Sequence, residues 1–234
     1  MSRRKVILVQ LPIPPVGPEP IRGNVPLAAA YLKMFARDRG SESHFEIDIF
    51  PPALANTLGD VALVEAIAKR EPWLVGFTCY LWNIERTLWI AERIKQLRPE
   101  VRILIGGPEV TLDNAWVLEH PAVDYAAIGE GEQTFAELLS ELAEKDEPSK
   151  PIAGLISLRL LSRKRVASDA AKIAFQPFTP SALQPFTPRQ PLPNLNAISS
   201  PYLAGILDAA DEQMLLLETI RGCIFKCNRT YAVP

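Results

Sequence analysis

The sequence contains little cysteine, histidine or net charge, and no long apolar run. Three of its 234 residues are cysteines, two are histidines, and the formal net charge is −2. Three cysteines do not make a disulfide framework, and so small a net charge gives no electrostatic reason to expect nucleic acid or an anionic membrane as a partner. No stretch approaches the ~18 consecutive apolar residues of a membrane-spanning helix. These absences predict a cytoplasmic globular protein that binds neither nucleic acid nor membrane.

Proline, by contrast, is abundant and unevenly placed, with 22 residues in the chain. One group lies between Pro12 and Pro20, and a second lies between Pro177 and Pro201, where the pentapeptide QPFTP occurs twice. Proline lacks a backbone donor and fixes φ, so neither group belongs in a helix interior or a central strand. Both groups are therefore expected to be loops or linkers.

Short apolar runs alternate with amphipathic segments from residue 5 to about residue 145. In residues 83–97, for example, apolar side chains recur at spacings of three or four, which places them on one helical face. Strands that alternate with helices pair in parallel through right-handed crossovers. The pattern predicts an α/β fold, a flavodoxin-like, doubly wound domain with a five-stranded parallel sheet. Its strands are expected at 5–11, 45–50, 73–78, 101–105 and 125–128, and its helices at 25–38, 58–70, 83–97, 111–119 and 132–144.

The character of the chain changes beyond residue 145. A small hairpin is expected at residues 154–161 and 165–168, and the proline-rich linker follows it. The apolar run at 214–218 predicts a strand that leads into an Arg-Gly-Cys sequence and begins another domain. We therefore divide the chain into an α/β domain, a hairpin with a linker, and the start of a further domain. The three divisions are 1–146, 147–210 and 211–234.

Glycine and polar residues gather after the predicted strands. Ligands of doubly wound sheets bind beyond the carboxyl ends of the strands, where glycine permits close approach and helix starts offer free N–H groups. These positions predict a rim that holds a large planar or anionic ligand, although any single glycine could simply turn a strand into a helix. The rim residues are Gly23, Asn24, Thr78, Tyr80, Trp82, Asn83, Gly106, Gly107, Pro108, Glu109, Gly129, Glu130, Gly131 and Glu132.

The same loops exclude three common functions of this fold. A response regulator needs an acidic pair after the first strand and an aspartate after the third, but Gln10 and the stretch 78–80 occupy those places. A flavodoxin needs a hydroxyl-rich phosphate loop where this chain has residues 12–15, Pro-Ile-Pro-Pro. The dinucleotide pattern G-x-G-x-x-G is also missing.

Four motifs taken together resemble one family. They are TCYLWNI at 78–84, GGPEV at 106–110, GEGE-x-TF at 129–135 and ETIRGCIFKC at 218–227. The first three are similar to the N-terminal cobalamin-binding domain of B12-dependent radical S-adenosylmethionine (SAM) proteins. The last is similar to the start of their catalytic radical SAM barrel, which this chain would contain only as an incomplete first strand.

The resemblance implies that cobalamin binds at the rim, with its nucleotide tail near residues 78–80 and 106–107. Many cobalamin domains contain a D-x-H-x-x-G loop whose histidine ligates cobalt, and this chain lacks that loop. Its two histidines, His44 and His120, are expected to be ordinary surface or helix-end residues. We therefore expect cobalamin to bind without a histidine ligand. Cys79 is expected to be a small buried thiol.

The family also binds a [4Fe–4S] iron-sulfur cluster through C-x-x-x-C-x-x-C, which leaves one iron open for S-adenosylmethionine. Cys223 and Cys227 match the first two metal-binding thiolates, but the third place is Thr230, whose hydroxyl is no substitute for a thiolate. We therefore expect the two cysteines to be vestigial ligands without a stable cluster. Either the gene is truncated or frameshifted after Cys227, which we favour, or the chain is a deliberate stand-alone module.

The leading hypothesis is a cobalamin-binding module of a B12-dependent radical SAM protein, with no catalytic residues of its own. The family role is radical-based methyl transfer or related chemistry. One alternative is a vestigial interaction domain that binds no cofactor, and another is a radical enzyme completed in trans by a second polypeptide. Whether the chain alone is an enzyme, and which protein partner it has, stay open.

Overall fold

A computed structural model of the chain describes residues 2–158, apart from 16, 18–20 and 22, and residues 186–221, apart from 209, 211–213 and 220. Within these residues, strands and helices alternate as the sequence predicts. The strands are β1 (Arg4–Gln10), β2 (Phe45–Ile49), β3 (Leu74–Thr78), β4 (Arg102–Gly106), β5 (Tyr125–Ala127) and β6 (Leu155–Ser157). The helices are α1 (Leu27–Arg37), α2 (Pro52–Thr57), α3 (Asp60–Ala68), α4 (Ile84–Leu97), α5 (Ala115–Leu118) and α6 (Gly131–Glu144).

The strands form one sheet in the order β2-β1-β3-β4-β5-β6. The first five are parallel, which confirms the predicted doubly wound, flavodoxin-like α/β fold. The prediction of only five strands was wrong, because β6 adds to the edge of the sheet antiparallel to β5. This strand has three residues, too few to show a periodicity, and we expected it in a local hairpin. The other half of that hairpin, residues 165–168, lies outside the described residues.

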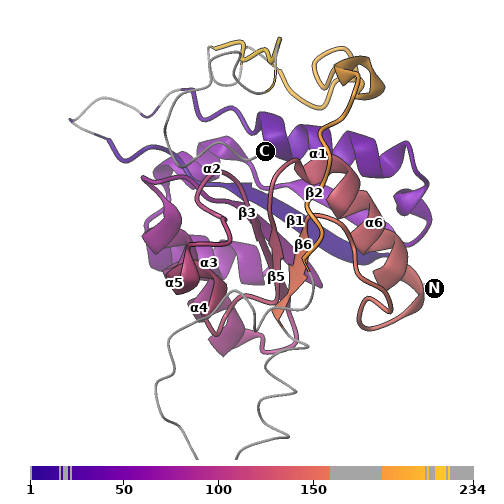
Figure 1. Ribbon diagram of the computed structural model, residues 1–234. Helices are drawn as coiled ribbons and strands as arrows, with labels where there is room; N and C mark the ends of the chain where they lie inside the picture. Colours follow the sequence, from indigo (N-terminus) through magenta and orange to yellow (C-terminus); the bar gives the residue numbers. More distant parts are fainter. Residues whose placement is uncertain are drawn as a thin grey trace, which may run out of the picture.

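Two layers of helices cover the sheet, with α1 and α6 on one face and α3, α4 and α5 on the other (Figure 1). The alternation along β1 explains this, because successive side chains of a strand point to opposite faces. Val6 and Leu8 pack with α1 and α6, whereas Ile7 and Val9 pack with the opposite helices. Both faces of the strand are therefore buried, as a parallel sheet between helices requires. Helix α2 was not predicted, but its Pro52 is compatible with a first helical turn.

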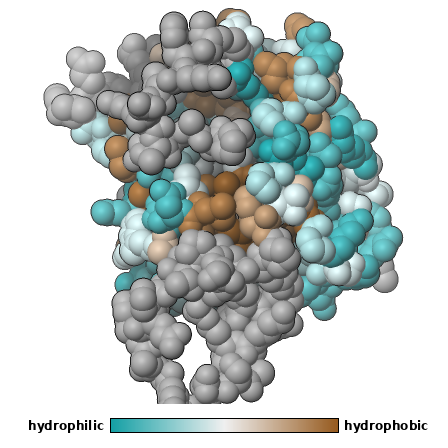
Figure 2. Space-filling view, viewed as in Figure 1, coloured by the Kyte–Doolittle hydropathy of each residue, from teal (hydrophilic) through white to brown (hydrophobic). Residues whose placement is uncertain are grey.

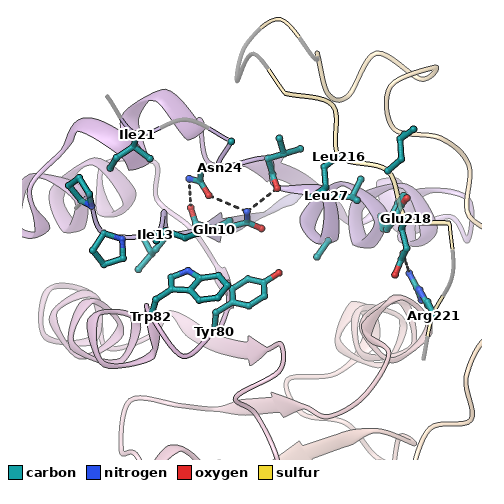
Figure 3. Close-up of a pocket in the computed structure, with 18 of the residues that line it drawn as sticks. Gln10, Ile13, Ile21, Asn24, Leu27, Tyr80, Trp82, Leu216, Glu218 and Arg221 are labelled. Atoms are coloured by element: carbon teal, nitrogen blue, oxygen red, sulfur yellow. Dashed lines mark hydrogen bonds and ion pairs between the residues drawn. The ribbon is translucent and has the colours of Figure 1, made fainter. Parts of the chain in front are cut away.

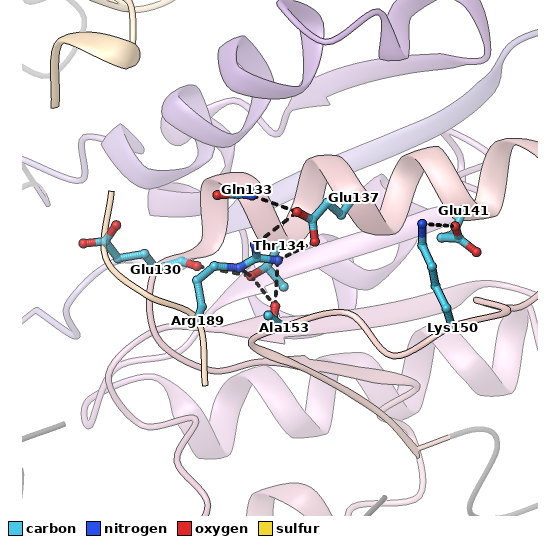
Figure 4. A network of polar contacts seen from close by, with 8 residues as sticks. All are labelled: Glu130, Gln133, Thr134, Glu137, Glu141, Lys150, Ala153 and Arg189. Carbon is cyan, nitrogen blue, oxygen red and sulfur yellow. Dashed lines mark hydrogen bonds and ion pairs between the residues drawn. The ribbon is translucent and has the colours of Figure 1, made fainter. Parts of the chain in front are cut away.

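The described part of the predicted linker is fastened to α6 rather than lying free. The Arg189 side chain is 8% exposed and makes a two-pronged ion pair with Glu137, at 2.6 and 3.1 Å (Figure 4). It also donates to the Thr134 hydroxyl and to the Ala153 carbonyl, at 3.1 and 2.8 Å. The Arg189 hydrogen bond lowers the pKa of Glu137. These contacts fix the return of the chain to the domain after residue 185.

The segment expected as a strand at 214–218 has no regular secondary structure over residues 214–219. Hydrogen bonding to a neighbouring strand defines a strand, and within the described chain this segment pairs with none. That part of the prediction was therefore wrong. The division of the chain at 146 and 210 stays a prediction. Among the described residues, none of the helices has both the length and the apolar character needed to span a bilayer.

Candidate functional site

A cavity of about 940 Å³ lies at the carboxyl ends of β1 and β3 (Figure 3). Its walls come from the loop after β1, the first turns of α1, the loop after β3, the start of α6, and residues 216–219 with Arg221. This volume is at the upper end of the usual range for small-molecule sites, about 300–1,000 Å³. The lining residues are Gln10, Leu11, Ile13, Pro14, Pro15, Gly17, Ile21, Gly23, Asn24, Val25, Leu27, Ala28, Tyr31, Tyr80, Trp82, Glu132, Leu216, Leu217, Glu218, Thr219 and Arg221.

A cluster of amides joins the end of β1 to the loop before α1. The Gln10 amide nitrogen donates to the Asn24 side-chain oxygen at 3.1 Å and to the Val25 carbonyl at 2.9 Å. The Asn24 amide nitrogen donates back to the Gln10 carbonyl at 3.2 Å and to the Asn56 side-chain oxygen at 2.8 Å. Asn24 is 6% exposed, and burial makes such bonds costly to lose. The network therefore fixes this wall of the cavity.

Two aromatic rings from the loop after β3 form another wall. The Tyr80 and Trp82 rings are stacked, with centroids 4.5 Å apart and planes 5° from parallel. They lie side by side beneath Gln10 and Ile13 in Figure 3. Asn83 holds their loop: its side-chain oxygen accepts from the Tyr80 N–H at 2.8 Å, and its amide donates to the Thr78 carbonyl at 3.1 Å. Burial, and secondarily the Glu218 carboxylate, raise the pKa of Tyr80.

Five of the fourteen rim residues predicted from the sequence line this cavity, namely Gly23, Asn24, Tyr80, Trp82 and Glu132. Asn83 lies behind it, where it supports the aromatic loop. The other eight are at the ends of β3, β4 and β5 but do not line the cavity. They are Thr78, Gly106, Gly107, Pro108, Glu109, Gly129, Glu130 and Gly131.

Gly107 allows the turn after β4 to pack against the end of β3. Its φ is +113°, and a Cβ placed on it would lie 2.5 Å from the Cys79 carbonyl oxygen and 2.9 Å from the Cys79 nitrogen. The Cys79 N–H donates to the Gly106 carbonyl at 2.6 Å, and the Glu109 N–H donates to the Cys79 carbonyl at 3.3 Å. The second glycine of the pair therefore serves a contact between two backbones. The Cys79 thiol is fully buried, as expected, and burial raises its pKa to about 12.

Both histidines lie near the amino ends of the strands, whereas the cavity lies at the carboxyl ends. His44 comes just before β2 and His120 shortly before β5, so both are at the amino ends of parallel strands. Burial lowers the pKa of His120. Neither histidine, each described by the structure, lines the cavity.

An arginine that the sequence did not single out joins the segment 214–221 to the start of α6. Arg221 contacts Glu132 through both of its terminal nitrogens, at 2.5 and 3.1 Å, and contacts Glu218 at 2.9 Å. It also lies 3.3 Å from Glu130. Burial alone would lower the pKa of the Arg221 guanidinium, but the hydrogen bonds to Glu132 and Glu218 raise it overall. The arginine therefore stays charged.

Within the part of the chain that the structure describes, no group of three or more His, Cys, Asp and Glu side chains could hold a metal ion. The predicted cluster ligands Cys223 and Cys227 lie outside the described residues, as does Thr230.

Comparison with known families identifies the domain around the cavity. Residues 24–139 match the model of the B12 binding domain. The chain carries a B12-binding domain. The matched range runs from the amide cluster at Asn24 to α6 and includes the aromatic loop after β3, so it contains three walls of the cavity. The geometry suits a large cofactor, since apolar and aromatic side chains surround a few fixed amides.

The B12-binding domain is homologous to those of cobalamin-dependent radical SAM methyltransferases. The chain is 29% identical to the cobalamin-dependent radical SAM methyltransferase TokK of Streptomyces tokunonensis over 216 residues, which cover 87% of this chain and 28% of that protein. The chain spans only 22–28% of the length of the curated relatives that it matches.

Two solved structures share the fold of the B12-binding domain. One is the radical S-adenosylmethionine methyltransferase TsrM from Kitasatospora setae, with tryptophan substrate and a SAM analog bound. It has a TM-score of 0.51 and 23% identity, with 66% of this chain and 28% of that chain covered. The other is the cobalamin-dependent S-adenosylmethionine radical enzyme OxsB with aqua-cobalamin bound. It has a TM-score of 0.50 and 15% identity, with 67% and 21% covered.

Proposed function

We propose that the chain is a cobalamin-binding module of a B12-dependent radical SAM protein, and that the cavity at the ends of β1 and β3 receives the corrin. The observation that carries the proposal is a cavity of about 940 Å³, set at the carboxyl edge of a sheet in a chain with a B12-binding domain. When bound, cobalamin supplies a cobalt centre that can carry a methyl group. The stacked rings of Tyr80 and Trp82 offer an apolar support for a flat macrocycle.

The residues of this chain bind and orient the cofactor rather than transfer protons. Gln10 and Asn24 are engaged with each other, so they hold the wall rigid and present amide groups of fixed direction. We infer that cobalamin binds here without a histidine ligand, because His44 and His120 are at the opposite edge of the sheet. Asn24 is 6% exposed and Asn83 is 1% exposed, and such burial suits a preformed site.

The purified chain should retain hydroxocobalamin through desalting, with about one corrin per protein by visible absorption. Ala28 lines the cavity from α1, so Ala28→Trp should fill the space and abolish most of the retention. The matched control is Ala53→Trp, on the exposed surface of α2, which should retain as much corrin as the unchanged protein. Replacing both histidines with alanine should also leave retention unchanged.

Two results would refute this proposal. If the unchanged chain keeps no corrin absorption, the domain does not hold cobalamin, and an interaction domain without a cofactor becomes the better explanation. The leucines at 215–217, which are 43–62% exposed, would then be the first surface to examine. If Ala28→Trp retains as much corrin as the unchanged chain, cobalamin binds elsewhere. Figure 2 shows hydrophobic residues near the middle of one face of the molecule.

For a complete protein that contains this domain, we propose the role of its relatives, radical-based methyl transfer or related chemistry. The support is the identity to the methyltransferase TokK along most of this chain. A complete protein supplied with a reductant under anaerobic conditions should consume S-adenosylmethionine only when cobalamin is present. Consumption at the same rate without cobalamin would contradict this role.

A further inference from the structure

Arg221 lies among three carboxylates that come from two distant parts of the chain. Glu130 and Glu132 begin α6, and Glu218 is on the same segment as the arginine. The Arg221 and Glu132 side chains are 16% and 7% exposed, so water screens this pair poorly. The two terminal nitrogens meet both oxygens of Glu132, the paired geometry in which arginine binds carboxylates most strongly.

Glu130 also joins a third segment to this cluster. Its carboxylate accepts a hydrogen bond from the Leu192 N–H at 2.7 Å while lying 3.3 Å from Arg221. The start of α6, the linker and the segment before the cysteines therefore meet at one residue. The free N–H groups at the start of a helix favour negative charge, so the start of α6 is a suitable place for both carboxylates.

The segment 214–219 has little else to hold it. Leu216 is fixed at its backbone by the Tyr202 hydroxyl, which donates to the carbonyl at 3.0 Å and accepts from the N–H at 3.1 Å. Met214 packs against Gly23, with its sulfur 3.0 Å from where a Cβ of that glycine would be. The side chains of residues 214–217 are 43–62% exposed, so burial alone does not hold the segment in place.

We propose that Arg221 is a positioning residue that fixes residues 216–219 as a wall of the cobalamin cavity, and that Glu130 and Glu132 act on this arginine rather than on the cofactor. The inference rests on the proposed function for the identity of the ligand. It assigns a use to the Gly-Glu-Gly-Glu motif, whose first three residues do not line the cavity. It also ties Arg221, two residues before Cys223 in the sequence, to the B12-binding domain.

We call the contacts of Arg221 with Glu130 and Glu132 the anchor. The anchor can be tested without cofactor by limited proteolysis with thermolysin, which cleaves before leucine. In the full chain free of cobalamin, Arg221→Gln and Glu132→Gln should each speed cleavage within 215–217 by about tenfold, since a lost charged hydrogen bond changes an opening equilibrium by roughly that factor. Mass spectrometry of the fragments locates the cut. Arg221→Lys keeps the charge but not the two-pronged contact, so its cleavage rate should fall between those of the unchanged chain and Arg221→Gln.

The link to the cavity is tested by the rate at which hydroxocobalamin is released into a large excess of competing corrin-binding protein. Arg221→Gln and Glu132→Gln should release it about tenfold faster than the unchanged chain. The matched control is Glu141→Gln on the same helix, whose carboxylate pairs with Lys150 at 3.3 Å away from the cavity (Figure 4). That variant should change neither rate.

Each failure has a distinct meaning. Unchanged thermolysin cleavage in Arg221→Gln would overturn the anchor, and faster cleavage with an unchanged release rate would overturn its role at the cavity. No cobalamin retained by the unchanged chain would refute the proposed function together with the cofactor half of this inference. A thermal melt separates these results from misfolding of Glu132→Gln, and Arg221→Gln lies outside the sheet and its helices, where it cannot disturb the core.

Discussion

Replacing Gly107 with alanine is expected to lower the free energy of unfolding by about 3 kcal/mol or more, because strain at positive φ adds to a collision. The new Cβ would lie 2.5, 2.9 and 3.2 Å from the oxygen, nitrogen and carbonyl carbon of Cys79. These are backbone atoms of a residue hydrogen-bonded to Gly106 at 2.6 Å, so they cannot turn aside as a flexible side chain would. The turn after β4 would have to move away from β3.

Gly40→Ala is the matched control, because Gly40 also has a positive φ, +81°, but nothing lies within 4 Å of its added Cβ. It should cost only the left-handed backbone penalty, about 1 kcal/mol. Urea unfolding followed by circular dichroism measures both variants. Equal losses would show that the backbone conformation alone matters and that Gly107 does not serve the close contact. The same comparison decides how the Gly-Gly sequence should be interpreted.

Most of the fold was predictable from the sequence because local pattern dictates it. Helix α4 was expected at 83–97 and spans Ile84–Leu97, since apolar side chains recur there at spacings of three or four. The order β2-β1-β3-β4-β5 is the one that the predicted flavodoxin-like class has. Strand β6 was expected in a local hairpin, and its pairing with β5 was not predicted, because tertiary packing sets the partner.

The candidate site was only partly predictable, for a different reason. Tyr80 and Trp82 were identified because they follow a strand, and that position alone places them at the carboxyl edge. Arg221 was not, because its partner Glu132 is 89 residues away in the sequence and nothing local to either residue signals the pair. Two glutamates at the start of a helix could predict an ion pair with an arginine far away in the sequence. That prediction becomes possible only when the topology shows which distant segments meet at the helix start.

Glycine shows the limit of interpreting strand ends as ligand contacts. Gly23 has a positive φ and lines the cavity, and its expected contact with a ligand stays a prediction. At Gly107, the same residue type serves the approach of one backbone to another, which is the simpler interpretation that each single glycine allowed. The sequence contains no feature that separates these two uses, because both require only the absence of a side chain.

Removing either ring of the stacked pair should weaken cobalamin binding by about tenfold to a hundredfold, since loss of a stacked aromatic contact typically costs about 1–3 kcal/mol. Tyr80→Ala should fall toward the upper end, because Tyr80 is the more buried ring and its loss also leaves the 44% exposed Trp82 without support. The dissociation constant for hydroxocobalamin, measured by equilibrium dialysis, gives the effect directly.

Leu81 provides the matched control for this prediction, because it lies between the two aromatic residues, is 77% exposed and does not line the cavity. Leu81→Ala should leave the dissociation constant unchanged, and the three variants should share one melting temperature within a few degrees, since none lies in the core. Unchanged affinity in both aromatic variants, with the loop intact, would mean that the corrin does not rest on this pair. Weakening in Leu81→Ala as well would point instead to the backbone of the loop, which Asn83 holds from behind.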